Sequence, residues 1–148
     1  MHQTLEQKRA EYAWSCAREA QGQGQQWLKE YVGLVKKLPA LITTNGLGQT
    51  LAFLAAKAKT KDGALRRDKP EGLLYLHLEG WLTRPDSPRG PYAEAPAGEG
   101  EEAPATRLLF RITRGDSATY RWATSEALAL IAWLKSLAEA LQEEEEAP

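Results

Sequence analysis

Apolar residues recur at helical spacing along most of this chain, and the clearest case lies near its C-terminus. The apolar positions there fall three and four residues apart, at Ala127, Leu130, Ile131, Leu134, Leu137, Ala138 and Leu141. This spacing puts them on one face of an α-helix, whereas a half-buried strand would need a two-residue repeat. Strand-like alternation of useful length does not occur, so the sequence predicts an all-α fold.

Four further helices are expected before this one. Thr4 followed by Gln7 is a capping-box pattern that opens the first helix, and the glycines of residues 21–26 favour its end. The apolar stripes of the other three helices run over about 27–38, 47–58 and 71–82. The helix over 71–82 is apolar nearly all round, which is typical of a central helix.

Other boundaries are set by single residues. Pro39 suits the first turn of a fresh helix, with residues 43–46 as the next turn. Either Asp116 or Thr124 could cap the last helix, and a start at Thr124 would put Glu126 in its first turn, where the helix dipole favours a carboxylate. Residues 107–112 are ambiguous between helix and strand. The sequence therefore predicts a compact bundle of about five to six helices.

A long segment without helical pattern separates the last helices from the rest. Residues 84–106 contain five Pro and three Gly, and their later part is acidic. Such a segment buries too little apolar surface to offset the entropy lost on ordering. We expect a single helical domain over 1–142 with a flexible loop at about 84–106, followed by an acidic tail at 143–148.

The formal net charge of −1 conceals an uneven distribution. Residues 1–91 carry fourteen Lys and Arg against nine Asp and Glu, and residues 107–142 carry five against three. The charges of 92–106 and of 143–148 are four Glu in each segment. Two acidic segments thus mask a body of about +7, and a partner responds to the local field.

The basic side chains gather at expected helix ends and in the loop over 61–70. Lys57 and Lys61, four residues apart, would share a helix face. Their neighbours in this cluster are Lys36, Lys37, Lys59, Arg66, Arg67 and Lys69, and a second basic stripe is formed by Arg107, Arg111, Arg114 and Arg121. Such a cluster attracts phosphates regardless of sequence. The alternative is that these are solvated helix ends that complement the helix dipole.

Catalytic and metal-binding patterns are not found. His77 lies in the most apolar helix and is interpreted as a core or rim histidine, and Cys16 lies on an apolar stripe and is interpreted as a small core residue. Neither has the neighbours of a Cys/His metal site, and no phosphate-binding glycine frame occurs. The longest uncharged stretch, 38–56, is too polar to span a bilayer. We expect a soluble, cytoplasmic protein that is not an enzyme, with no cofactor, no metal and no membrane partner.

Two aromatic residues lie off the apolar stripes. Phe53 and Trp133 each sit one position, or about 100°, from a stripe leucine. An aromatic side chain outside the core face is a candidate interface anchor. A broad core face, in helices packed on two sides, is the alternative.

Three segments resemble a known family. Residues 37–57 (KLPALITTNGLGQTLAFLAAK), with 7–14 and 120–140, resemble the small helical subunit of the type III-B CRISPR effector, the Cmr complex. The resemblance implies an all-helical bundle without catalytic activity, stacked head-to-tail in several copies beside the subunits that hold the CRISPR RNA. Its implied partners are the backbone and large Cmr subunits, further copies of itself, and the duplex of target RNA with CRISPR RNA.

The resemblance also extends the set of candidate contacts with the RNA backbone. The matching segments contain Lys8 and Arg9 near the N-terminus, Lys57, and Arg121 and Lys135 near the C-terminus. Together with the basic cluster, the candidates are Lys8, Arg9, Lys36, Lys37, Lys57, Lys59, Lys61, Arg66, Arg67, Arg121 and Lys135. Two other functions stay open: a protein–protein adaptor that docks an acidic partner, and a free-standing nucleic-acid-binding protein.

Overall fold

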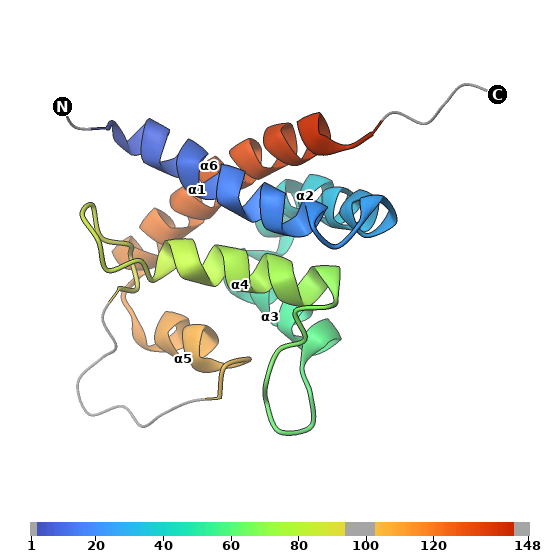
Figure 1. Cartoon of the computed structure of the whole chain (residues 1–148). Coiled ribbons are helices and arrows are strands. Elements are labelled where there is room, and N and C mark those ends of the chain that lie inside the picture. Colours follow the sequence, from blue (N-terminus) through green and yellow to red (C-terminus); the bar gives the residue numbers. More distant parts are fainter. Residues whose placement is uncertain (1–2, 94–102, 144–148) are drawn as a thin grey trace.

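The computed structural model describes residues 3–93 and 103–143, and within these ranges its regular elements are helices (Figure 1). An isolated antiparallel bridge pairs Lys59 with Leu65. The helices are α1 (Leu5–Gln21), α2 (Gln25–Asn45), α3 (Leu47–Ala58), α4 (Pro70–Leu82), α5 (Arg107–Arg114) and α6 (Ser117–Leu141). The predicted all-α bundle is confirmed, and the ambiguous segment 107–112 is helical.

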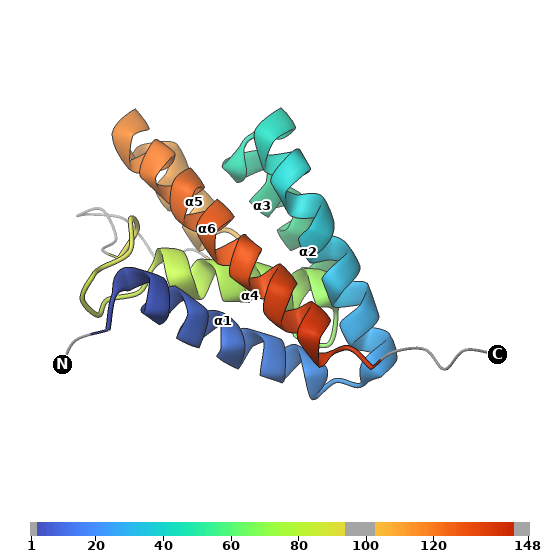
Figure 2. The ribbon, with the colours of Figure 1, turned by 90° about the horizontal axis from the view of Figure 1, so that it is seen from above.

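The fourth helix is buried over most of its length. α4 contacts α1, α2, α3 and α6, and its Leu73, Leu74 and Leu78 are buried. Figure 1 shows α1 and α6 crossing on one side of α4, with α3 and α5 on the other, and in Figure 2 the C-terminal ends of α1 and α6 converge. Because α4 is apolar nearly all round, it can be covered from several directions, as the sequence predicts.

Most helix ends follow the sequence signals. The capping box is present, with Gln7 N donating to Thr4 Oγ1 and Thr4 N donating to Gln7 Oε1. The Asp116 side chain accepts from Thr119 N and caps α6. Gly46 separates α2 from α3 at φ 87°, a conformation that favours glycine.

The expected helix start at Pro39 is wrong, because Pro39 lies inside α2. A proline in a helix interior removes one hydrogen bond and costs roughly 3 kcal/mol. Pro39 is exposed, whereas Leu38 and Ile42 on either side of it are buried. Continuous burial of this apolar face keeps the helix intact through the proline.

The alternative start of the last helix at Thr124 is also wrong. α6 begins seven positions before Thr124, at Ser117, and Thr124 is an interior residue whose hydroxyl donates to Tyr120 O. Glu126 therefore lies well beyond the first turn, and it is buried. The helix dipole does not explain a carboxylate at this position.

Part of the segment expected to be a flexible loop packs against α4. Tyr92 N donates to Leu82 O, Gly90 N donates to Arg84 O, and the Tyr92 side chain is buried. Residues 84–93 are therefore an ordered strap, which is anchored by the buried Tyr92. Residues 94–102, where most of the acidic charge of this segment lies, fall outside the described residues.

Candidate nucleic-acid interface

Six basic residues gather where α3 ends and α4 begins. This α3–α4 cation cluster consists of Lys57, Lys59, Lys61, Arg66, Arg67 and Lys69. The connection is a structured turn: Thr60 N donates to Ala64 O, and Gly63 adopts φ 84°. In Figure 1 the turn projects away from the bundle. α3 ends at Ala58, so the expectation that Lys57 and Lys61 share a helix face is wrong, although both belong to the cluster.

Most side chains of the cluster are exposed at the surface. Arg66 forms a two-bond pair with Asp68, with 2.7 Å and 3.1 Å contacts, and half of its side chain is exposed. The Lys69 ammonium donates to Lys57 O at 3.0 Å. In the described part of the chain Lys59 and Lys61 have no side-chain partner. These cations are available to an anion from solution.

A glycine allows the loop to approach α4 closely. A Cβ at Gly72 would lie 1.9 Å from Arg66 O and 3.0 Å from the Ala58 side chain. In addition, Arg66 N donates to Ala58 O at 2.9 Å. The second half of the loop is thereby held against both α3 and α4. The position of the cation cluster depends on this contact.

The adjacent lysines Lys36 and Lys37 of α2 point in different directions. Lys37 lines an open groove of about 640 Å³ that is shared with Trp27 and Lys69, so it adjoins the cluster. Lys36 points to α6, where its ammonium lies 3.3 Å from Glu139. Adjacent helical positions are about 100° apart, which explains the separation.

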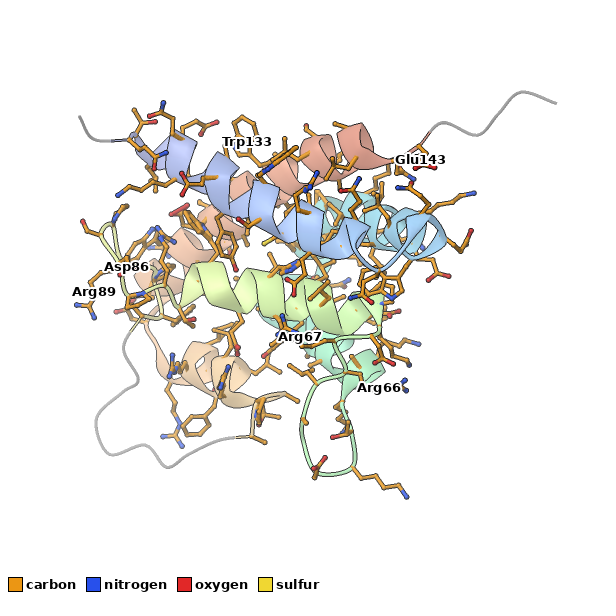
Figure 3. The ribbon with its side chains drawn as sticks, in the orientation of Figure 1. Arg66, Arg67, Asp86, Arg89, Trp133 and Glu143 are labelled. Carbon is orange, nitrogen blue, oxygen red and sulfur yellow. The ribbon has the colours of Figure 1, made fainter. Side chains whose placement is uncertain are left out.

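The basic residues near the N-terminus lie elsewhere. Lys8 Nζ donates to Ser87 O at 2.7 Å, beside the strap at the far end of α4. Figure 3 shows that the two ends of α4 are well separated: Arg66 and Arg67 lie near its start, and Arg89 lies beyond its end. Lys8 and Arg9 therefore do not extend the α3–α4 cation cluster.

Arg9 belongs to a buried ion cluster. Its Nε and Nη2 donate to Glu126 Oε2 at 3.0 Å and 2.7 Å, and Arg84 Nη2 donates to Glu126 Oε1 at 3.1 Å. The side chains of Arg9, Arg84 and Glu126 are 17%, 12% and 3% exposed. Burial lowers the pKa of Arg84, against the opposing effect of Glu126. This Arg9–Glu126–Arg84 ion cluster joins α1, α6 and the strap, and sequence reasoning missed it.

Two arginines of the second basic stripe pair with groups of the protein itself. Arg107 makes a two-bond pair with the buried Glu79, at 2.7 Å and 3.1 Å, and links α5 to α4. Arg111 donates to Tyr92 O at 3.0 Å. Arg121 and Lys135 are exposed on α6, apart from the α3–α4 cation cluster.

Neither His77 nor Cys16 is placed for catalysis. His77 is 5% exposed; its Nδ1 lies 2.8 Å from the Tyr31 hydroxyl and its Nε2 lies 2.7 Å from Glu19 Oε1. Burial lowers the pKa of His77, which keeps the imidazole neutral near pH 7. Burial raises the pKa of the Cys16 thiol to about 12, so the reactive thiolate is suppressed. The interpretation of His77 as a core or rim histidine and of Cys16 as a core residue is confirmed.

Metal-ligating and membrane-spanning features are likewise not seen over 3–93 and 103–143. These residues contain no group of three His, Cys, Asp or Glu side chains that could hold a metal ion. No helix in the same ranges has the length and apolar character needed to cross a membrane.

The two candidate interface aromatics differ in their surroundings. Phe53 is 42% exposed, with the Lys57 ammonium 5.7 Å from its ring centre. Trp133 is half-buried, and its Nε1 donates to Glu6 at 3.0 Å, which joins α6 to α1. Trp133 therefore has a role within the bundle, whereas Phe53 faces solvent.

Alanine substitutions should separate these two roles. We expect Phe53→Ala to change the free energy of unfolding by less than about 0.5 kcal/mol, and Trp133→Ala to lower it by about 2 kcal/mol because packing and the Glu6 contact are lost. Urea denaturation measures both values. Equal losses would show that Phe53 is a core residue.

The structure is that of a small all-α bundle whose basic side chains are divided between surface cations and ion pairs within the protein. The sequence matches the family model described as CRISPR-associated protein (Cas_Cmr5) over residues 5–141. The chain belongs to this family, the small subunit of the type III-B CRISPR complex. The resemblance found in the sequence is confirmed.

Proposed function

We propose that this chain is a non-catalytic subunit of a cytoplasmic Cmr complex, stacked in several copies, and that its α3–α4 cation cluster contacts the backbone of the target RNA. The observation that carries the proposal is the density of exposed cations on the loop between α3 and α4. Family membership supplies the complex. The backbone and large subunits and the CRISPR RNA would be its partners there.

The chemistry of the cluster suits this task. Base pairing with the guide supplies sequence specificity, so the subunit needs only contacts with phosphates. Lysine and arginine on a pinned loop can provide them without base-reading motifs. Each copy offers few contacts, so a single copy should bind weakly and a row of copies strongly.

Charge reversal tests the proposed face. We expect replacement of Lys37, Lys59 and Lys61 by Glu to weaken target-RNA retention by the assembled complex at least tenfold. The slope of log affinity against log salt concentration should become shallower by about 2 for each copy that contacts the RNA. The bundle should still fold, because these side chains form no ion pair with any residue in the described part of the chain. Filter binding over a range of salt concentrations gives both quantities.

A matched variant on another face serves as the control. Replacement of Arg114, Arg121 and Lys135 by Glu changes the net charge equally but leaves the α3–α4 cation cluster intact. Retention should then fall much less. The reverse result would move the RNA contact to α5 and α6, and loss of partner subunits with unchanged RNA retention would favour the adaptor function.

A further inference from the structure

The loop that carries the cation cluster is anchored to the bundle through a closed set of contacts. We call this set the His77 circuit; its members are His77, Glu19, Arg67, Asp68, Trp27 and Tyr31. On one side, Glu19 accepts from both His77 Nε2 and Arg67 Nη2, at 2.7 Å and 2.8 Å. Glu19 thus connects a buried imidazole directly to an exposed guanidinium.

The other side of the circuit returns to the same histidine. Trp27 Nε1 donates to Asp68 O at 2.8 Å, and the Trp27 ring stacks on Tyr31 at 6.1 Å and 15°. The Tyr31 hydroxyl lies 2.8 Å from His77 Nδ1. Consecutive loop residues are therefore held by two chains of contacts that both end on His77.

Arg67 combines a fixed orientation with free donors. Its side chain is 61% exposed, and among the described residues its guanidinium donates only through Nη2, to Glu19. The remaining N–H groups of the guanidinium fork are open to a phosphate. Glu19 can keep its bond while Arg67 binds an anion.

The tyrosine and cysteine side chains around His77 are neutral at physiological pH. Tyr12 of α1 donates to His77 O, Cys16 of α1 lies nearby, and Tyr31 of α2 contacts the ring. Burial raises the pKa of all three. Burial also acts to raise the pKa of Glu19, but the hydrogen bonds from His77 and Arg67 outweigh it and leave this pKa below its usual value. Glu19 and Arg67 are therefore the charges that His77 senses.

We propose that Glu19 and His77 are positioning residues of the RNA-binding face, which orient Arg67 toward a phosphate and link phosphate binding to protonation of the His77 imidazole. This inference rests on the proposed function. An RNA phosphate on Arg67 adds negative charge beside the circuit and offsets the guanidinium that disfavours the imidazolium. The imidazolium can still donate to Glu19 through Nε2, and the Tyr31 hydroxyl can accept from Nδ1.

The direction of the linkage follows from these charges. In the free protein the pKa of His77 is lowered, with burial as the main cause and Arg67 as a further one. A bound phosphate raises this pKa, so binding takes up a proton between the free and bound values. RNA affinity is then greater below this interval and smaller above it, by about threefold for one exposed charge pair.

Histidine NMR on the full chain tests the link. His77 and His2 are the histidines of the sequence, and a His2→Gln background leaves one ring to follow through a pH titration. We expect a saturating single-stranded RNA oligonucleotide to raise the pKa of His77 by about 0.5, the equivalent of a threefold linkage. The same RNA should leave it unchanged in Arg67→Gln and in Glu19→Gln.

Control variants separate this inference from the proposed function. Lys61→Gln removes a cation of the same cluster outside the circuit, so it should weaken binding while the His77 shift persists. An RNA that binds the full chain without moving the His77 pKa overturns the linkage but leaves the proposed RNA face in place. Absence of RNA binding by the chain and by the assembled complex overturns both.

Discussion

Replacement of Glu126 by Ala should lower the free energy of unfolding by about 3–5 kcal/mol. The carboxylate accepts three hydrogen bonds from Arg9 and Arg84, whose side chains are 17% and 12% exposed. Without Glu126, two largely buried guanidinium groups lose the carboxylate they share, and Arg9 keeps only Glu6, an exposed carboxylate 3.3 Å from its Nη1. Removal of the carboxylate is costly because the guanidinium groups stay largely out of water and no longer gain the ion pair that offsets their lost hydration. Urea denaturation followed by tryptophan fluorescence measures the loss.

The matched control is on the same helix. Glu139 also pairs with a cation of another helix, Lys36, but their side chains are 38% and 53% exposed. Glu139→Ala should cost less than about 1 kcal/mol, because solvent screens this pair. Similar losses for the two variants would show that the Arg9–Glu126–Arg84 ion cluster contributes no more than a surface contact.

Gly72→Ala should lower the free energy of unfolding by about 3 kcal/mol, although alanine is normally the better helix residue. The added methyl group would lie 1.9 Å from Arg66 O, and backbone cannot rotate away as a flexible side chain can. The loop must move off α4, which also displaces Arg66 and Arg67. The variant should therefore lose both thermal stability and RNA retention.

Gly33→Ala is the corresponding control in α2. A Cβ at this position would meet nothing within 4 Å, so the usual helix propensity applies and a gain of roughly 0.5–1 kcal/mol is expected. The same substitution should thus have opposite signs at the two glycines. A loss of stability at Gly33, or a gain at Gly72, would contradict the packing described for the loop.

The helices were largely predictable because burial repeats with the helical period. The stripe from Ala127 to Leu141 is buried or half-buried as expected, and the capping signals of Thr4 and Asp116 are both used. The helix start predicted at Pro39 was wrong because burial of the apolar face of α2 outweighs the local preference of proline for a first turn. Tyr92 was overlooked because one anchoring aromatic in a Pro/Gly segment carries no periodic signal.

The candidate site was predictable in charge but not in pairing. Lysines and arginines over 57–69 could be counted from the sequence, and they do lie together. The ion pair of Arg9 with Glu126 joins residues 117 positions apart in the sequence. A local sequence pattern contains no information about such a contact. A lone carboxylate inside the apolar stripe of the last helix was the only available signal, and it was attributed to the helix dipole.

Within the described chain, the most extensive contact between helices joins α1 to α6, the first helix to the last. Synthesis proceeds from the N-terminus, so α1 leaves the ribosome long before its main partner exists. The buried face of α1 consists of Ala13, Cys16, Ala17 and Ala20, too little apolar surface to hold a 17-residue helix by itself. The bundle therefore closes late, when α6 emerges and Glu126 meets Arg9. A chain interrupted before α6 would lose its first helix as well as its last.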